Sequence, residues 1–245
     1  MGYIIPVGPY HPALEEPIHT KLHVEGEVIR EAEVFVGYNH RGIEKLACER
    51  NFLQTITLVE RVCGICSHSH TLAYCMALEH IAQMEVPRRG QYIRAIIAEL
   101  ERLHSHFLWL GLACHCVGHD SMFMHIWNER EIVMDILELL TGNRVNYAMN
   151  TVGGARRDID DDKRTRVLAM LDTLTPALKR IHELFATDKT LGMRTHGVGV
   201  LTNADAITLG AIGPHARASG VNTDVRRDAP YCCYDEFLFD VPVVE

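Results

Sequence analysis

Apolar and polar residues alternate along 19–38, in HTKLHVEGEVIREAEVFVGY, on both sides of the pair Glu25-Gly26. A period of two is typical of strands, and a glycine between two alternating runs is typical of a tight turn. The apolar positions expected on one face of such a hairpin are Leu22, Val24, Val28, Val34 and Val36. The stretch 1–40 is therefore predicted to be a small antiparallel β element.

Beyond Gly42 the spacing of apolar residues changes to three and four, which is the period of an α-helix. The clearest series is Ile93, Ile96, Ile97, Leu100, Leu103 and Phe107, in a helix that Pro87 can open. Further segments with a helical pattern are 43–62, 71–84, 121–140 and 160–185. We expect Thr141-Gly142 to stop one of these helices and Pro176 to kink or break another.

These patterns predict a mainly α fold, an α-helical bundle with a small N-terminal antiparallel β element. Residues 1–40 form the β-rich part and residues 41–245 the helical body of a single domain. From Gly192 onward the chain is rich in glycine and is expected to be less regular.

Composition narrows the classes of function. The chain has 245 residues, 47% of them hydrophobic, which is enough to bury a core, and its net charge of -8 gives no sign of nucleic-acid binding. No apolar run approaches the roughly 18 residues of a membrane-spanning helix, and the N-terminus lacks the basic region of a signal peptide. Eight cysteines without an export signal indicate a reducing compartment, and fifteen histidines favour metal chemistry.

The stretch RVCGICSHSH, residues 61–70, concentrates candidate metal ligands. Cys63-x-x-Cys66 has a chelating spacing, because a turn lets both thiolates face one ion. If a helix begins at Cys66, His70 lies on the same face one turn later, and its ring N–H can reach the Cys66 sulfur. Arg61 adds a positive charge that favours the thiolate. The alternatives are two buried thiols at a helix start, a zinc site, and a redox dithiol, which is disfavoured because no βαβ pattern surrounds it.

On these residues the chain resembles the large, catalytic subunit of nickel–iron hydrogenases, whose first cysteine motif has the form Arg-x-Cys-Gly-x-Cys-x3-His. Other stretches resemble the membrane-bound, energy-converting branch of that family, which is related to the 49 kDa quinone-site subunit of respiratory complex I. They are GPYHPALEEP, HRGIEKL, ELERLHSHFLWLG, ELLTGNRVNYAMNTVGGARRDI and RASGVNTDVRRDAPY. The resemblance covers essentially the whole chain and implies a hydrogenase large-subunit fold.

The resemblance implies a nickel–iron centre whose iron carries carbon monoxide and cyanide. In the family the first cysteine of the motif binds nickel alone and the second bridges nickel and iron, so Cys63 is expected to be the terminal ligand and Cys66 the bridging one. His70 matches the histidine that hydrogen-bonds the bridging sulfur, and Arg61 is expected to act as a catalytic residue beside the centre. Soft thiolates suit such a site, and they can accept a proton when hydrogen is split.

Two carboxylates and one histidine match further family positions. Glu44 resembles a glutamate that helps some members hold a magnesium ion, although a salt bridge with Arg41 or Lys45 would also account for it. Glu16 resembles the glutamate that relays protons between the metal thiolate and solvent, with a solvated loop carboxylate as the alternative. His11 matches a loop near the quinone pocket of the complex I relative, and it is expected to be structural or part of a proton path.

The chain departs from the family pattern in its thiolates. The family uses four, and the second pair is a CxxC near the C-terminus of the full subunit, whereas this sequence contains one CxxC. Cys232 and Cys233 are adjacent, so in an extended segment they point to opposite sides, and we expect both to be packing residues. The chain is therefore expected to be C-terminally incomplete, either a fragment or a natural truncation, and inactive on its own.

Other polar clusters are expected to be structural. The segment 114–119, CHCVGH, has a zinc-like spacing, but packing and loop roles are favoured. Cys48 and Cys75 lie in helical patterns and are expected to be core thiols. His104 and His106 lie on opposite sides of one helix, so one of them is expected to make a structural hydrogen bond with Glu101 or another neighbour.

Three hypotheses about function follow. The first is the catalytic subunit of an energy-converting nickel–iron hydrogenase, an oxidoreductase that evolves or oxidises hydrogen with a ferredoxin-like electron donor. Its partners would be a small subunit carrying an iron–sulfur cluster and the ion-translocating subunits of a membrane arm, and the chain would lie peripherally on the cytoplasmic side of the membrane. The second is a metal-free NADH/quinone oxidoreductase subunit of the complex I type. The third is a non-catalytic or zinc-binding module built on this fold.

Overall fold

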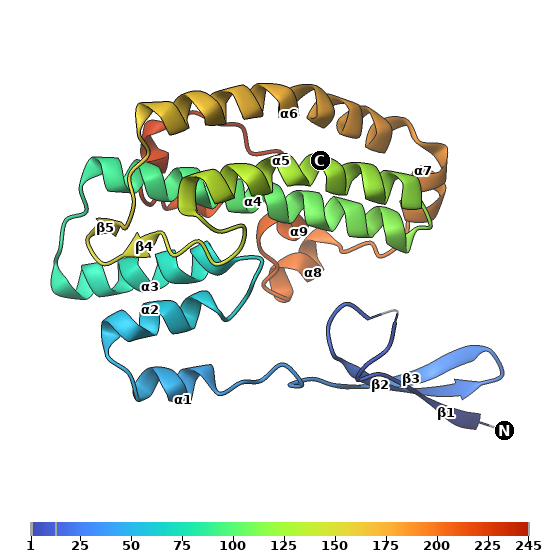
Figure 1. The fold of residues 1–245 in the computed structure, drawn as a ribbon. Coiled ribbons are helices and arrows are strands. Elements are labelled where there is room, and N and C mark those ends of the chain that lie inside the picture. Colours follow the sequence, from blue (N-terminus) through green and yellow to red (C-terminus); the bar gives the residue numbers. More distant parts are fainter. Residues whose placement is uncertain (1, 13, 245) are drawn as a thin grey trace. The chain divides into compact units, whose positions relative to one another are not determined.

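The structure is a computed structural model that describes residues 2–12 and 14–244 (Figure 1). The chain forms two compact units, residues 1–51 and 52–245. Strands dominate the first unit and helices the second. The mainly α fold with a small N-terminal antiparallel sheet is therefore confirmed, whereas the assignment of the whole chain to a single domain stays a prediction.

A three-stranded antiparallel sheet makes up most of the first unit. Its strands are β1 (Gly2–Val7), β2 (His19–Glu25) and β3 (Val28–Phe35), in the order β1-β2-β3. β2 and β3 form the predicted hairpin, but the register shifts between His23 and Val24. Because cross-strand partners share a face, Ile29, which pairs with Val24, takes the place predicted for Val28.

The edge strand β1 was not predicted, because GYIIPV is a short apolar run without alternation and contains Pro6. Proline is tolerated in an edge strand, where its nitrogen need not donate to a neighbour. The short helix α1 (Ile43–Cys48) follows the sheet and has no buried residue among those described. Cys48 is exposed there, so its expected role as a core thiol is wrong.

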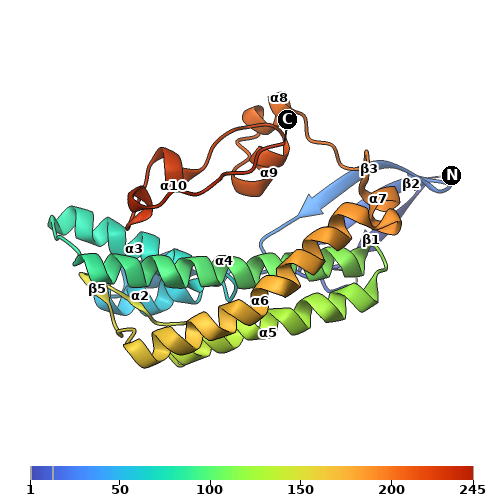
Figure 2. The ribbon, with the colours of Figure 1, turned by 90° about the horizontal axis from the view of Figure 1, so that it is seen from above.

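The second unit is built around three long helices that run side by side (Figures 1 and 2). They are α4 (Arg88–Cys116), α5 (Asp120–Thr141) and α6 (Asp161–Thr187). The shorter α2 (Phe52–Glu60) and α3 (Ser67–Ala82) precede them, and α3 packs against α4. A two-stranded hairpin, β4 (Asn150–Thr151) and β5 (Gly154–Ala155), follows α5 in the sequence and packs against α3 and α4. The remaining elements are short, namely α7 (Lys189–Thr195), α8 (Asn203–Thr208), α9 (Gly213–Ala218), α10 (Val225–Asp228) and the 3-10 helix η1 (Tyr234–Glu236).

Apolar side chains between the long helices form the main core. Its members with an exposed fraction of 2% or less include Ile97, Phe107, Ile126, Val133, Ile136, Leu137, Leu140 and Leu174. The apolar stripe predicted for α4 is therefore buried along most of its length. Ile96 is the exception, because it lies at the edge of the stripe and is 40% exposed.

The predicted single helix over 43–62 and the predicted break at Pro176 are wrong, whereas a kink at Pro176 stays a prediction. The segment 43–62 contains two helices rather than one, because the polar run 49–51, Glu-Arg-Asn, interrupts the apolar pattern. The helix α6 runs unbroken through Pro176. Pro176 lies on the exposed side, where water can replace the lost backbone hydrogen bond, while the buried Leu174 and Ala177 keep the helix packed.

The predicted helix ends are confirmed at three places. Pro87 is the N-cap residue of α4. Gly142 ends α5 in the left-handed conformation that glycine favours, with φ 82°. The Asp160 carboxylate accepts the backbone N–H of Lys163 at 2.9 Å and so caps α6.

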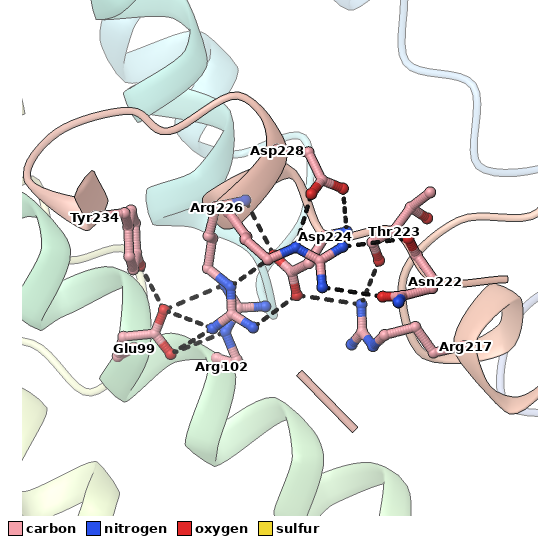
Figure 3. Close-up of polar contacts among 10 residues, drawn as sticks. Glu99, Arg102, Arg217, Asn222, Thr223, Asp224, Arg226, Asp228 and Tyr234 are labelled. Carbon is pink, nitrogen blue, oxygen red and sulfur yellow. Dashed lines mark hydrogen bonds and ion pairs between the residues drawn. The ribbon is translucent and has the colours of Figure 1, made fainter. Parts of the chain in front are cut away.

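An ionic network ties the stretch that follows α9 to α4 (Figure 3). Its central residue is Arg226, whose guanidinium donates to Asp224 at 2.9 Å and to Glu99 at 3.2 Å. The Asp224 carboxylate also pairs with Arg217 at 3.2 Å, and the hydroxyl of Tyr234 donates to Glu99. Charge-assisted hydrogen bonds therefore hold a stretch that contains little regular structure against a long helix.

Candidate functional site

Cys63 and Cys66 lie in the loop that joins α2 to α3, and the structure brings their side chains together. Cys63 lies close enough to Cys66 to be one of the groups that raise the pKa of the Cys66 thiol. Cys66 is the N-cap residue of α3, and the backbone N–H of His70 donates to its carbonyl at 3.2 Å. His70 therefore lies one helical turn after Cys66, as predicted, while the hydrogen bond from the His70 ring to the Cys66 sulfur stays a prediction.

The first turn of α3 rests on a buried carboxylate from α4. Glu101 is 3% exposed, and its carboxylate accepts the backbone N–H groups of His68 and Ser69 at 2.6 and 3.0 Å. The hydroxyl of Ser69 donates to it as well, at 2.5 Å. Burial raises the pKa of Glu101, and these hydrogen bonds oppose that rise. The carboxylate thus satisfies N–H groups at a helix start that would otherwise lack partners.

The loop between the two cysteines is held by His104, one turn further along α4. The Arg130 guanidinium donates to His104 Nδ1 at 3.2 Å, so the ring proton lies on Nε2. Nε2 then donates to the carbonyl of Ile65 at 3.1 Å, and Ser105 donates to the same oxygen at 3.3 Å. Burial and the neighbouring Arg130 lower the pKa of His104 to about 4. The predicted structural hydrogen bond of a histidine is therefore confirmed for His104, with Ile65 rather than Glu101 as its partner.

A second buried histidine connects α3 to the β4–β5 hairpin. Asn150 donates to His68 Nδ1 at 3.1 Å, and His68 Nε2 donates to the carbonyl of Arg94 at 3.0 Å. Burial lowers the pKa of His68 to about 3, so the ring is neutral at physiological pH. Its tautomer is set by these two partners.

An ion pair buried between α3 and α4 anchors the same hairpin. The guanidinium of Arg94 meets the carboxylate of Glu79 in two parallel hydrogen bonds of 2.6 and 2.9 Å. Glu79 also accepts the backbone N–H of Gly153, and Arg94 donates to the carbonyls of Thr151 and Gly154. Neither residue belongs to a recognisable motif, so no pattern in the sequence points to this pair.

Burial is the main influence on the protonation of the Cys66 thiol. Burial, followed by the hydrogen bond with Cys63, raises the pKa of Cys66 to about 12, so the thiol is protonated at neutral pH. The Arg61 side chain is 54% exposed, donates to the carbonyl of Thr57 at 3.0 Å and lies 3.6 Å from the Glu60 carboxylate. Arg61 is not among the groups that shift the pKa of Cys66, and its expected effect on the thiolate stays a prediction. A bound metal ion would displace the thiol proton.

The other predicted site residues lie in the N-terminal unit. His11 and Glu16 line the same surface cavity, about 390 Å³ in volume, in the loop between β1 and β2. The Glu16 carboxylate accepts the amide N–H of Asn39 at 2.6 Å, and Glu44 lies in the first turn of α1. The roles expected of Glu16 and Glu44 at a metal centre, and of His11 in a proton path, stay predictions.

The segment 114–119 is not arranged as a zinc site. Cys114 is fully buried, whereas Cys116 is exposed. The ring of His115 pairs with Asp120 at 2.7 Å, and His119 lies 3.8 Å from Asp188. These side chains therefore serve separate contacts, which agrees with the structural roles favoured by the sequence.

The cysteines near the end of the described chain also have separate environments. Cys233 is fully buried in a small cluster with Ala95 and Tyr234, as expected of a packing residue. Cys232 is half-buried, and burial raises the pKa of its thiol to about 11.

The donors present fit part of a thiolate metal site. Over residues 2–12 and 14–244, no three His, Cys, Asp or Glu side chains are grouped as a metal site. Cys63 and Cys66 supply two soft sulfur donors near each other, and soft thiolates are ligands of transition metals. A metal ion held by this pair would complete its shell with ligands from other groups.

Two protein families match this chain, each over a different range of residues. Residues 41–111 match the family described as nickel-dependent hydrogenase, and this range contains the two cysteines and most of α4. Residues 116–245 match the family described as respiratory-chain NADH dehydrogenase, 49 kDa subunit. No helix in the described part of the chain combines the length and apolarity needed to cross a membrane.

Individual relatives also include both hydrogenases and an NADH-quinone oxidoreductase subunit. The carbon monoxide-induced hydrogenase of Rhodospirillum rubrum is 46% identical over 99% of this chain and 68% of its own length. The membrane-bound hydrogenase subunit alpha of Pyrococcus furiosus is 46% identical over 91% of this chain and 52% of its own length. An NADH-quinone oxidoreductase subunit of Dehalococcoides mccartyi is 38% identical over 100% of this chain and 67% of its own length.

A solved structure shares the fold. The matching chain belongs to a membrane-bound sulfane sulfur reductase, an archaeal respiratory membrane complex, with a TM-score of 0.92 and 32% identity. The match covers 99% of this chain and 65% of that one. Across these four proteins, the chain spans between 52% and 68% of the relative's length.

Proposed function

The chain belongs to the family that joins the 49 kDa subunit of respiratory-chain NADH dehydrogenase with the nickel-dependent hydrogenases, and we propose that it is the catalytic subunit of an energy-converting hydrogenase. The observation that carries the proposal is that the Cys63 and Cys66 thiols lie near each other in the loop that leads into α3. Members of the family that need no metal have no use for this pair, whereas two thiolates at this spacing are able to chelate one metal ion.

In this proposal Cys63 and Cys66 are the ligands that this chain contributes to a nickel–iron centre. When bound, such a centre supplies the redox chemistry that interconverts hydrogen with protons and electrons. The Cys66 sulfur gives up its proton to the solvent on ligation and is then able to accept a proton during turnover. His70 orients that sulfur, Glu16 relays the proton, Arg61 provides positive charge beside the centre, and Glu44 helps to hold a magnesium ion.

The proposal extends to the complex in which the chain works. Relatives are named membrane-bound hydrogenase subunit and formate hydrogenlyase subunit. By analogy, the partners of this chain are a small subunit with an iron–sulfur cluster, the ion-translocating subunits of a membrane arm and a ferredoxin-like electron donor. The chain lies peripherally on the cytoplasmic side of the membrane in this arrangement.

A second candidate is a quinone-reactive subunit that holds no metal. The match of residues 116–245 to the 49 kDa subunit and the similarity to the NADH-quinone oxidoreductase of Dehalococcoides mccartyi favour it. It leaves the paired thiols of Cys63 and Cys66 without a role, and for that reason we place it second.

Metal analysis of the natively assembled complex tests the proposal. We expect stoichiometric nickel and iron together with hydrogen-dependent reduction of an artificial electron acceptor. The variants Cys63→Ser and Cys66→Ser should lose both nickel and hydrogen oxidation. The exposed Cys116→Ser serves as the matched control and should keep both. A complex without nickel that reduces quinone would overturn the proposal in favour of the second candidate.

A further inference from the structure

The cysteine motif rests on one face of α4. Glu101 and His104 are three residues apart on this helix, so their side chains project from adjacent turns of the same face. Glu101 binds the backbone just after Cys66, and His104 binds the backbone between Cys63 and Cys66. We call these two side chains the α4 clamp.

The carboxylate of the clamp acts on the helix that Cys66 begins. Its three hydrogen bonds come from the first turn of α3, at His68 and Ser69, and a negative charge is favourable at the N-terminal end of a helix dipole. Because Cys66 is the N-cap residue, fixing that turn also fixes the direction in which α3 starts and the place of the Cys66 side chain.

The imidazole of the clamp acts on the loop itself. Arg130, from α5, donates to Nδ1 and so leaves Nε2 as the donor to the carbonyl of Ile65. The backbone N–H of Ile65 donates to the Cys63 sulfur at 3.3 Å. His104 therefore holds the carbonyl of Ile65, and the backbone N–H of the same residue donates to the sulfur of Cys63.

Both members of the clamp are costly to bury. Glu101 is 3% exposed and His104 is fully buried, at positions where an apolar residue would extend the buried stripe of α4. Burying a carboxylate and an imidazole is unfavourable unless directional hydrogen bonds offset the cost. Beyond packing, Glu101 and His104 give the cysteine motif a defined orientation.

We propose that Glu101 and His104 are positioning residues that preset the two cysteine sulfurs for metal binding. This inference rests on the proposed function, in which Cys63 and Cys66 are ligands. Groups that orient metal ligands through hydrogen bonds change metal affinity by about 10- to 100-fold when they are replaced. A loss of that size is expected here, because the sulfurs must otherwise be ordered at the moment of binding.

Cobalt(II) added to the reduced, metal-free 245-residue chain is the probe, and its thiolate-to-metal absorption is the readout. Glu101→Gln and His104→Leu should weaken cobalt binding about 10- to 100-fold and alter the absorption spectrum. His104→Gln, whose amide N–H can reach Ile65, should recover part of the affinity. The controls Glu138→Gln and His106→Gln, at exposed positions, should bind cobalt like the unchanged chain. Equal affinity in the clamp variants and the controls would overturn the proposal.

Amide hydrogen exchange in the metal-free chain separates this inference from the proposed function. Loss of the clamp should speed exchange at residues 65–69, and the controls should not. If Glu101→Gln does not fold, Ser69→Ala is the second variant. It removes one of the three hydrogen bonds to the Glu101 carboxylate and should speed exchange at residues 65–69 to a smaller extent. A parent chain without any thiolate–cobalt absorption counts against the proposed function. Unchanged exchange at 65–69 in the folded variants counts against the clamp.

Discussion

Glu79 and Arg94 face each other in the interior between α3 and α4, with side chains that are 6% and 2% exposed and two hydrogen bonds of 2.6 and 2.9 Å. The same pair binds the backbone of the β4–β5 hairpin at Gly153 and Gly154. The hairpin is therefore attached to the helices through charges rather than through apolar contacts alone.

Removing one member of this pair should be strongly destabilising. Arg94→Met leaves the Glu79 carboxylate buried without its counter-charge, which typically costs about 3–5 kcal/mol. Urea unfolding of the variant measures the loss. In the double variant Glu79→Leu/Arg94→Met the loss should be smaller than the sum of the two single losses, because no unpaired charge remains. Additive losses would show that the two side chains act independently.

Gly111 should not tolerate a larger residue. A Cβ atom at this position of α4 would lie 2.4 Å from Trp127 Cδ1 and 2.5 Å from Trp127 Nε1 on α5. Gly111→Ala is therefore expected to force the two helices apart at a cost of about 1–3 kcal/mol, measured by thermal or urea unfolding. Gly192→Ala in α7 is the matched control, since no heavy atom lies within 4 Å of its added Cβ. Equal stability of the two variants would contradict the close approach of the helices.

Acid should weaken the network of Figure 3 through Asp224. The hydrogen bonds from Arg226 are the main reason why the pKa of Asp224 falls from 3.8 to about 2. A carboxyl with a lower pKa in the folded state stabilises the fold above its unfolded pKa and loses this contribution as the pH falls through the folded one. The contribution should be about 2 kcal/mol above roughly pH 4 and should disappear towards pH 2.

Unfolding measured between neutral pH and pH 2 checks this expectation. Asp224→Asn should be less stable than the parent at neutral pH and should show a shallower loss of stability below pH 4. Asp235→Asn, at an exposed position close by, should leave the acid profile as in the parent. If the parent and Asp224→Asn have the same stability at every pH between neutral and 2, Asp224 does not make this contribution.

Cys114 and Cys116, in the segment 114–119, should differ in how fast their thiols react. Cys116 is exposed and should be alkylated readily in the folded chain, whereas Cys114 is fully buried and burial raises the pKa of its thiol. Alkylation followed by peptide mass spectrometry should label Cys116 first and Cys114 after denaturation. Addition of zinc should protect neither residue, because their neighbours His115 and His119 make separate contacts. Protection of both cysteines from alkylation by zinc would support the zinc site that the spacing of 114–119 suggests.

Much of the helical architecture was predictable because its signals are local. The apolar stripe of α4 shows the helical period, Gly142 supplies the left-handed residue that ends α5, and Asp160 caps α6 through a hydrogen bond within four residues. The hairpin of β2 and β3 was predicted in the same way. Its register shift was not, because a bulge depends on how the two strands pair and leaves no mark in the alternation of either strand.

The sequence by itself determined which long segments are helices, where α4 begins and α5 ends, and that two cysteines lie three residues apart before a helix, because these properties depend on neighbours along the chain. Tertiary structure decided what supports those thiols. Glu101 contacts His68 across 33 residues, and Arg130 sets the tautomer of His104 across 26. The sequence shows that these residues are polar within a buried stripe. Their partners depend on which turns of α3, α4 and α5 meet, and the packing of the whole core fixes that choice.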